Sequence, residues 1–184
     1  MNTDERIVKT FKEMARYKGF KALSLETLAA EAGVTRRTIY SYFSNKNDLI
    51  EKVVTAFLSD VDSQLEDLIN KSDLIDSFAA TAKSILKDGA FLFNLQSLKD
   101  LQVYYPKTWQ QIEDFRINLI NSLVEVIFKR TKKKWVLEMN PRILKEALLA
   151  IDRRFSTPEF ASEIELPIEE LTLEMAKLMI YPYL

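Results

Sequence analysis

Apolar residues recur every three or four positions along most of the 184-residue chain, the spacing that places them on one face of an α-helix. No segment combines the alternation of a strand with the residues of a hairpin turn. In residues 4–18 the apolar stripe consists of Ile7, Val8, Phe11, Met14 and Ala15. The pattern therefore predicts an all-α protein of about nine helices.

The breaks in this pattern indicate where the helices end. Gly19, Gly33 and Gly89 each follow a helical run, as glycine commonly does just beyond a helix C-terminus. The helix expected after residue 46 would be about 35 Å long, enough to run from one domain into another. The predicted helices span residues 4–18, 24–32, 35–42, 47–70, 72–88, 90–105, 108–134, 141–155 and 167–180.

The helices at 24–32 and 35–42 are short and are joined by the tight turn Gly33-Val34. Such a pair predicts a helix-turn-helix unit, whose second helix enters the major groove of DNA. The outward side of that second helix carries hydrogen-bond donors suited to phosphates and base edges: Thr35, Arg36, Arg37, Thr38, Tyr40, Ser41 and Tyr42. The alternative is that these residues form an ordinary solvated helix face.

The charge distribution favours the DNA-binding interpretation. The chain carries 26 basic and 27 acidic side chains, for a formal net charge of −1. Residues 1–50 hold nine basic and six acidic residues, so this segment alone has a charge of +3. A basic N-terminal segment suits a polyanionic partner. A second basic run at residues 129–134 is interpreted instead as a solvated helix C-terminus, where cations complement the helix dipole.

Composition excludes much of enzyme chemistry. The chain has no cysteine and no histidine, which removes disulfides, thiolate nucleophiles, imidazole bases and His-ligated metals. The carboxylate pairs have no nucleophile, glycine loop or metal-ligand spacing beside them. We expect neither an enzyme, nor a cofactor, nor a metal site. The polar N-terminus and the lack of a long apolar run predict no signal peptide, no membrane partner and a location in the cytoplasm.

The residues of the helix-turn-helix also match a known family pattern. They are Leu28-Ala29, Ala32-Gly33-Val34-Thr35, Thr38-Ile39-Tyr40-Ser41-Tyr42-Phe43 and Lys46 before Asp48-Leu49. This arrangement resembles the TetR (tetracycline-repressor-like) family of bacterial transcription regulators. One departure is Arg37, where the family often has a small residue such as Gly or Ala.

The resemblance implies a DNA-binding domain at residues 1–46 and a helical effector-binding and dimerisation domain at 47–184. It implies a regulator, most often a repressor, that binds a palindromic operator in double-stranded DNA as a homodimer. Tyr40, Tyr42, Thr38 and Lys46 would contact phosphates, and Thr35, Arg36 and Arg37 would read bases. The expected DNA-binding residues are Ser24, Thr27, Thr35, Arg36, Arg37, Thr38, Tyr40, Ser41, Tyr42 and Lys46.

The resemblance also implies a small-molecule pocket among the middle helices, with apolar walls and a few polar groups. An aromatic cluster around residues 104–109 is the candidate, and the alternative is that its aromatics fill a helical core. The candidate effector-binding residues are Phe93, Gln102, Tyr104, Tyr105, Trp109 and Phe115. Two competing functions remain: a DNA-binding protein without ligand response, and a helical enzyme with a DNA-binding-like N-terminus.

The last two predicted helices each carry an apolar stripe, which suits a four-helix bundle between two copies of the chain. The alternative is that both stripes face the core of their own subunit. The expected dimer-interface residues are Leu144, Ala147, Leu148, Ile151, Phe155, Leu171, Met175, Leu178 and Met179.

Overall fold

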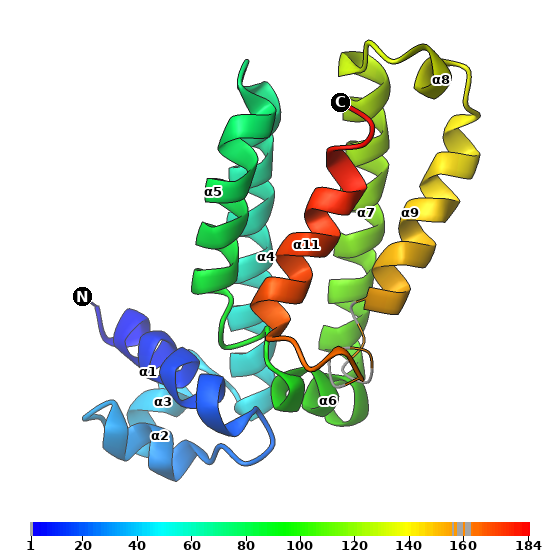
Figure 1. The fold of residues 1–184 in the computed structure, drawn as a ribbon. Helices are drawn as coiled ribbons and strands as arrows, with labels where there is room; N and C mark the ends of the chain where they lie inside the picture. Colours follow the sequence, from blue (N-terminus) through cyan, green and yellow to red (C-terminus); the bar gives the residue numbers. More distant parts are fainter. Residues whose placement is uncertain (1, 156, 158–159, 161–162) are drawn as a thin grey trace. The chain divides into compact units, whose positions relative to one another are not determined.

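The computed structural model describes residues 2–155, 157, 160 and 163–184. Within these residues the chain forms ten helices and no strand, which confirms the predicted all-α fold (Figure 1). The helices are α1 (Thr3–Lys18), α2 (Leu25–Glu31), α3 (Arg36–Tyr42), α4 (Lys46–Asn70), α5 (Leu74–Asp88), α6 (Leu95–Tyr104), α7 (Pro106–Arg130), α8 (Lys134–Leu137), α9 (Pro141–Phe155) and α11 (Ile168–Ile180).

The start of α6 differs from the prediction of a helix at 90–105. Residues 90–94 form a turn, and Asn94 is the N-cap, accepting the Ser97 N–H at 2.8 Å. The Asn94 amide also donates to the carbonyls of Ala90 and Phe91. Asparagine bonds neighbouring backbone in this way, so it favours a turn followed by a helix start over a helix interior.

The chain divides into two compact units. Unit 1 comprises Met1–Ser59 and Asp88–Gln111, and unit 2 comprises Asp60–Lys87 and Ile112–Leu184. Both α4 and α7 begin in unit 1 and end in unit 2. The functional division at residues 46 and 47 stays a prediction, since the compact units separate further along α4.

The core of unit 1 is built around Phe20, which follows α1 and is fully buried. Its ring stacks on Phe11 of α1 at 5.7 Å between centroids. Its edges meet Phe91 and Tyr105, at 6.3 and 6.4 Å. Aromatic pairs in these geometries add to the stabilisation from burial itself. Residues from 88–111 thus complete the core beneath the first three helices.

The connection between α1 and α2 needs glycine at position 19. Gly19 has φ +70° and ψ −179°, a conformation that is essentially restricted to glycine. A Cβ atom there would lie 2.6 Å from Cγ of Gln96 and 2.8 Å from Oδ2 of Asp100. Gly33 also has a positive φ, +62°, but a Cβ there would meet nothing within 4 Å.

These two glycines give a matched stability test. We expect Gly19→Ala to destabilise the fold by about 1–3 kcal/mol from backbone strain, and further from the clash with α6. Gly33→Ala has strain without a clash, so we expect a loss of about 1 kcal/mol. Urea unfolding of both variants measures the difference, and equal losses would contradict the close packing of α6 on Gly19.

Unit 2 contains two apolar clusters joined by α11. Met179 belongs to the cluster that holds Leu144 and Leu148 of α9, while Ile180 packs on the cluster around Phe78. Helices α9 and α11 are in contact with each other. Between α7 and α9, the half-buried Arg116 donates to the Asp152 carboxylate at 2.9 Å.

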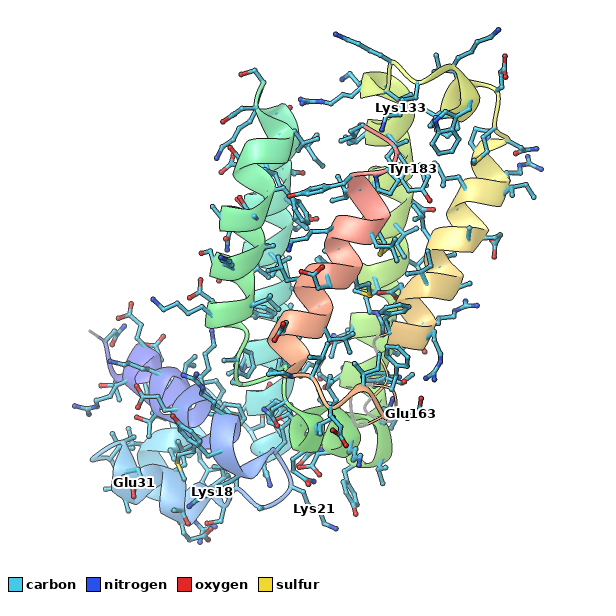
Figure 2. All side chains as sticks on the ribbon, in the orientation of Figure 1. Lys18, Lys21, Glu31, Lys133, Glu163 and Tyr183 are labelled. Carbon is cyan, nitrogen blue, oxygen red and sulfur yellow. The ribbon has the colours of Figure 1, made fainter. Side chains whose placement is uncertain are left out.

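The basic run at 129–134 bonds carbonyl oxygens within unit 2. Arg130 donates to the carbonyls of Ile69 and Lys71, at the end of α4. Lys133 donates to the carbonyl of Pro182 at 2.9 Å, near Tyr183 (Figure 2). These contacts satisfy carbonyls at a helix end and near the C-terminus.

Candidate nucleic-acid interface

Helices α2 and α3 form a helix-turn-helix with capped ends. The Ser24 hydroxyl accepts the Thr27 N–H at 3.0 Å, and the Thr35 hydroxyl accepts the Thr38 N–H at 3.0 Å. Between the helices, the Val34 N–H donates back to the Ala29 carbonyl at 2.9 Å while Gly33 takes its positive φ. This pattern is a Schellman-type helix end. The predicted motif and its turn are therefore confirmed.

Helix α3 has one buried side and one exposed side. Ile39 is fully buried and Phe43, just beyond the helix, is 5% exposed. Both side chains pack α3 against the rest of unit 1. Thr38 is half-buried, and the Ser41 hydroxyl donates to the Thr38 carbonyl at 2.7 Å. The other predicted contacts on this helix are exposed: Thr35, Arg36, Arg37, Tyr40, Ser41 and Tyr42. Donors thus cover the face that is free to meet a ligand.

The two adjacent arginines of α3 have different surroundings. Arg36 Nη1 lies 2.5 Å from Oε1 of Glu26, in the first turn of α2. Arg36 Nη2 donates to the Tyr40 hydroxyl at 3.3 Å. The hydrogen bond to Tyr40, followed by the charge of Glu26, raises the pKa of Arg36. Within the described chain, Arg37 has no comparable partner, so its guanidinium is the unengaged one.

Lys46, at the start of α4, is half-buried and its ammonium already has a protein acceptor. Its Nζ donates to the Lys21 carbonyl at 2.9 Å. Burial lowers the pKa of Lys46, and the nearby Asp100 carboxylate acts in the opposite direction. The predicted phosphate contact at this position therefore also ties α4 to the connection between α1 and α2.

Lys21 is the centre of a polar group that we call the Lys21 cluster, made of Lys21, Lys46, Gln96, Asp100 and Tyr104. The buried Asp100 carboxylate accepts the Lys21 N–H and the Gln96 amide, both at 2.7 Å. Lys21 Nζ donates to the Tyr104 hydroxyl at 2.5 Å, with Lys21 lying beside α6 (Figure 2). Three hydrogen-bonding groups of Lys21 are thus held by α4 and α6.

The helix-turn-helix region matches a known regulatory family. Residues 7–53 match the family described as "Bacterial regulatory proteins, tetR family". The chain thus carries an N-terminal segment of the TetR type. It is accordingly a DNA-binding transcription regulator, as the sequence predicted.

Relatives and solved structures are similar to this chain over most of its length. An uncharacterised HTH-type transcriptional regulator, YvaF of Bacillus subtilis, is 24% identical over 159 residues, or 85% of this chain and 83% of YvaF. The fatty acid degradation regulator FadR of Bacillus halodurans has a similar fold, with a TM-score of 0.67 and 17% identity over 97% of this chain and 95% of FadR. FadR of Bacillus subtilis, solved in complex with stearoyl-CoA, has a TM-score of 0.65 and 18% identity over 96% and 97%.

The predicted effector residues are divided between the two compact units. Phe93, Gln102, Tyr104, Tyr105 and Trp109 belong to unit 1, and Phe115 belongs to unit 2. Tyr105 is 9% exposed and packs on Phe20, while Phe93 packs on Phe57 at 5.9 Å. For these two aromatics the structure favours the core role that the sequence left open. The effector site stays a prediction.

The predicted dimer-interface residues separate by burial. Leu144, Leu148, Leu171 and Met179 are at most 6% exposed and pack within their own subunit. Such side chains have almost no surface left for a second copy, so for these four the core alternative applies. Ile151, Phe155 and Met175 are half-buried. Ala147 is exposed and Leu178 is 48% exposed, and these two mark the surface still available.

The described residues contain no group of three or more acidic side chains arranged to hold a metal ion. None of their helices is both long and apolar enough to cross a membrane.

Sequence reasoning missed two acidic residues that hold basic parts of the N-terminal region in place. Asp100 carried no signal in the sequence, because helical spacing indicates apolar faces and does not reveal a buried carboxylate. Glu26 carried none, since no periodicity rule relates it to Arg36 ten residues later. Only the fold brings the charges of Glu26 and Arg36 together.

Proposed function

We propose that the protein is a cytoplasmic repressor that binds a palindromic operator as a homodimer and is controlled by a small molecule. The observation that carries the DNA-binding part is the exposed row of donors on α3, which includes Arg37, a residue with no side-chain partner in the described part of the chain. An exposed recognition helix with guanidinium and hydroxyl groups has the chemistry required for phosphate and guanine contacts.

The effector class is proposed from a structural neighbour. FadR of Bacillus subtilis was solved in complex with stearoyl-CoA, so acyl-CoA thioesters are the first class to test here. The coupling route we propose runs through α6, because its Asp100 and Tyr104 bond Lys21 in the connection between α1 and α2. A ligand acts in this way only if it binds the two positions of α6 with different affinities.

Selection of bound sequences from random duplex DNA tests the proposal directly. We expect a discrete palindromic sequence with half-sites about one helical turn apart, or a multiple of it. Stearoyl-CoA added to the complex should then change the bound fraction, with free coenzyme A as the control. Recovery of unrelated sequences only would contradict sequence-specific regulation, and an unchanged bound fraction would contradict the acyl-CoA effector.

The role of Arg37 gives a residue-level prediction. We expect Arg37→Ala to weaken binding to the selected operator by about 1–3 kcal/mol, because a bidentate guanine contact would be lost. Preference should relax at one base pair of each half-site. Arg153→Ala removes an exposed arginine from α9 in unit 2 and is the control. Fluorescence anisotropy at fixed salt measures both, and an unaffected Arg37 variant would contradict base reading by this residue.

A further inference from the structure

We propose that Glu26 is a specificity-determining residue, which positions the Arg36 guanidinium for base reading across the helix-turn-helix. This inference rests on the proposed DNA-binding function of α3. The contacts that support it lie within α2 and α3, both of which belong to unit 1.

Three contacts hold Arg36 in one place. Its Nη1 atom lies 2.5 Å from the Glu26 carboxylate, and its Nη2 atom donates to the Tyr40 hydroxyl at 3.3 Å. Its guanidinium carbon lies 5.8 Å from the centroid of the Tyr40 ring. Glu26 comes from the first turn of α2 and Arg36 from the first turn of α3. The side chain is therefore fixed at the N-terminal end of the recognition helix, the end that contacts base edges in such motifs.

The stability of the fold does not explain this ion pair. The side chains of Arg36 and Glu26 are 52% and 58% exposed, and exposed pairs contribute little to folding stability. The Arg36–Glu26 ion pair contributes instead to DNA binding, by pre-organising Arg36. A long arginine side chain that is already ordered loses less conformational freedom when it binds a base. Among the residues that the structure describes, Arg37, one residue later, has no such partner.

The same carboxylate has a cost for DNA binding in general. A negative charge beside the recognition helix repels phosphates, and the repulsion acts on every sequence alike. An ordered Arg36 favours only the duplexes that present guanine at the correct position. Glu26 thus lowers affinity for all DNA while it raises the ratio between correct and incorrect sites, a balance typical of specificity by repulsion.

Glu26→Gln tests the inference, with Glu31→Gln as the matched control. Glu31 is an exposed acid at the other end of α2, so its substitution changes the charge of the same helix without affecting Arg36 (Figure 2). The base pair to follow is the one where Arg36→Ala relaxes preference. We expect Glu26→Gln to lower discrimination there about tenfold, within the range of one bidentate contact, and to raise affinity for unrelated duplex DNA. Glu31→Gln should raise affinity for unrelated DNA alone.

A double variant separates positioning from direct reading. If Glu26 acts through Arg36, Glu26→Gln should cause no further loss of discrimination at that base pair in the Arg36→Ala background. Additive losses would show that Glu26 reads a base by itself and would overturn the inference. Equal discrimination by Glu26→Gln and Glu31→Gln would overturn it as well. Failure of wild-type protein to select any discrete sequence would instead overturn the proposed function.

Discussion

Charging the exposed face of α9 and α11 is expected to give a monomer that binds a palindromic operator on the order of 100-fold or more weakly than wild type. Ala147 of α9 and Leu178 of α11 are exposed, and their helices are in contact. Ala147→Glu with Leu178→Glu adds two carboxylates at exposed positions of these helices and leaves the buried leucines intact. Across a two-fold axis, each new carboxylate would face one of the two new carboxylates of the other copy, and the like charges would repel.

The loss of affinity follows from linkage between the two reading heads. When one head of a dimer binds its half-site, the second is held near the other half-site at a high effective concentration. A monomer lacks that advantage. Sedimentation measures the oligomeric state and anisotropy the affinity, with Val103→Glu as a control at a 67% exposed apolar residue of α6. A double variant that remains dimeric would exclude this surface.

The second large effect is expected at Asp100. Asp100→Ala removes the acceptor of the Lys21 N–H, the partner of the Gln96 amide and the counter-charge near Lys46. Leaving such groups unsatisfied in a buried position should lower the free energy of unfolding by about 2–3 kcal/mol. For a chain of this length the unfolding midpoint should fall by about 5–10 °C. Calorimetry measures both quantities.

Two further variants make the Asp100 experiment specific. Asp100→Asn retains an oxygen that can accept the Lys21 N–H, so it should be less destabilising than Asp100→Ala. Asp62→Ala removes an exposed aspartate of α4 and should change stability by at most about 0.5 kcal/mol. A stable Asp100→Ala variant would show that the Lys21 cluster contributes little to the fold.

Much of the helical architecture was predictable because periodicity reports which side of a segment is buried. The stripe of α1 is an example, since Ile7, Phe11 and Ala15 are all fully buried. Caps were predictable where Ser24 and Thr35 precede a helical run. The start of α6 was not predictable from apolar spacing. It depends on hydrogen bonds from the Asn94 amide to the carbonyls of Ala90 and Phe91, which the spacing does not indicate.

The candidate interface was predictable to the level of which residues are exposed on α3. Their individual roles were not, because these depend on partners distant in sequence. Arg36 and Arg37 are adjacent and chemically identical, yet Glu26 engages only the first. The apolar stripes predicted for a dimer show a related limit. An apolar stripe indicates that a helix face is buried, but it does not indicate what buries it, and Leu148 is buried in the core of its own chain.

The discontinuity of unit 1 has a consequence for the order of events during synthesis. Residues 88–111 supply Phe91, Asp100 and Tyr105 to the packing around Phe20 and Lys21. A nascent chain emerges from the ribosome N-terminus first. Unit 1, which contains the helix-turn-helix, therefore cannot complete its core until residue 111 has left the ribosome. A fragment cut after the helix-turn-helix would leave Phe20 short of its partners. The helix-turn-helix is thus synthesised before residues 88–111, yet the unit that contains it can fold completely only after them.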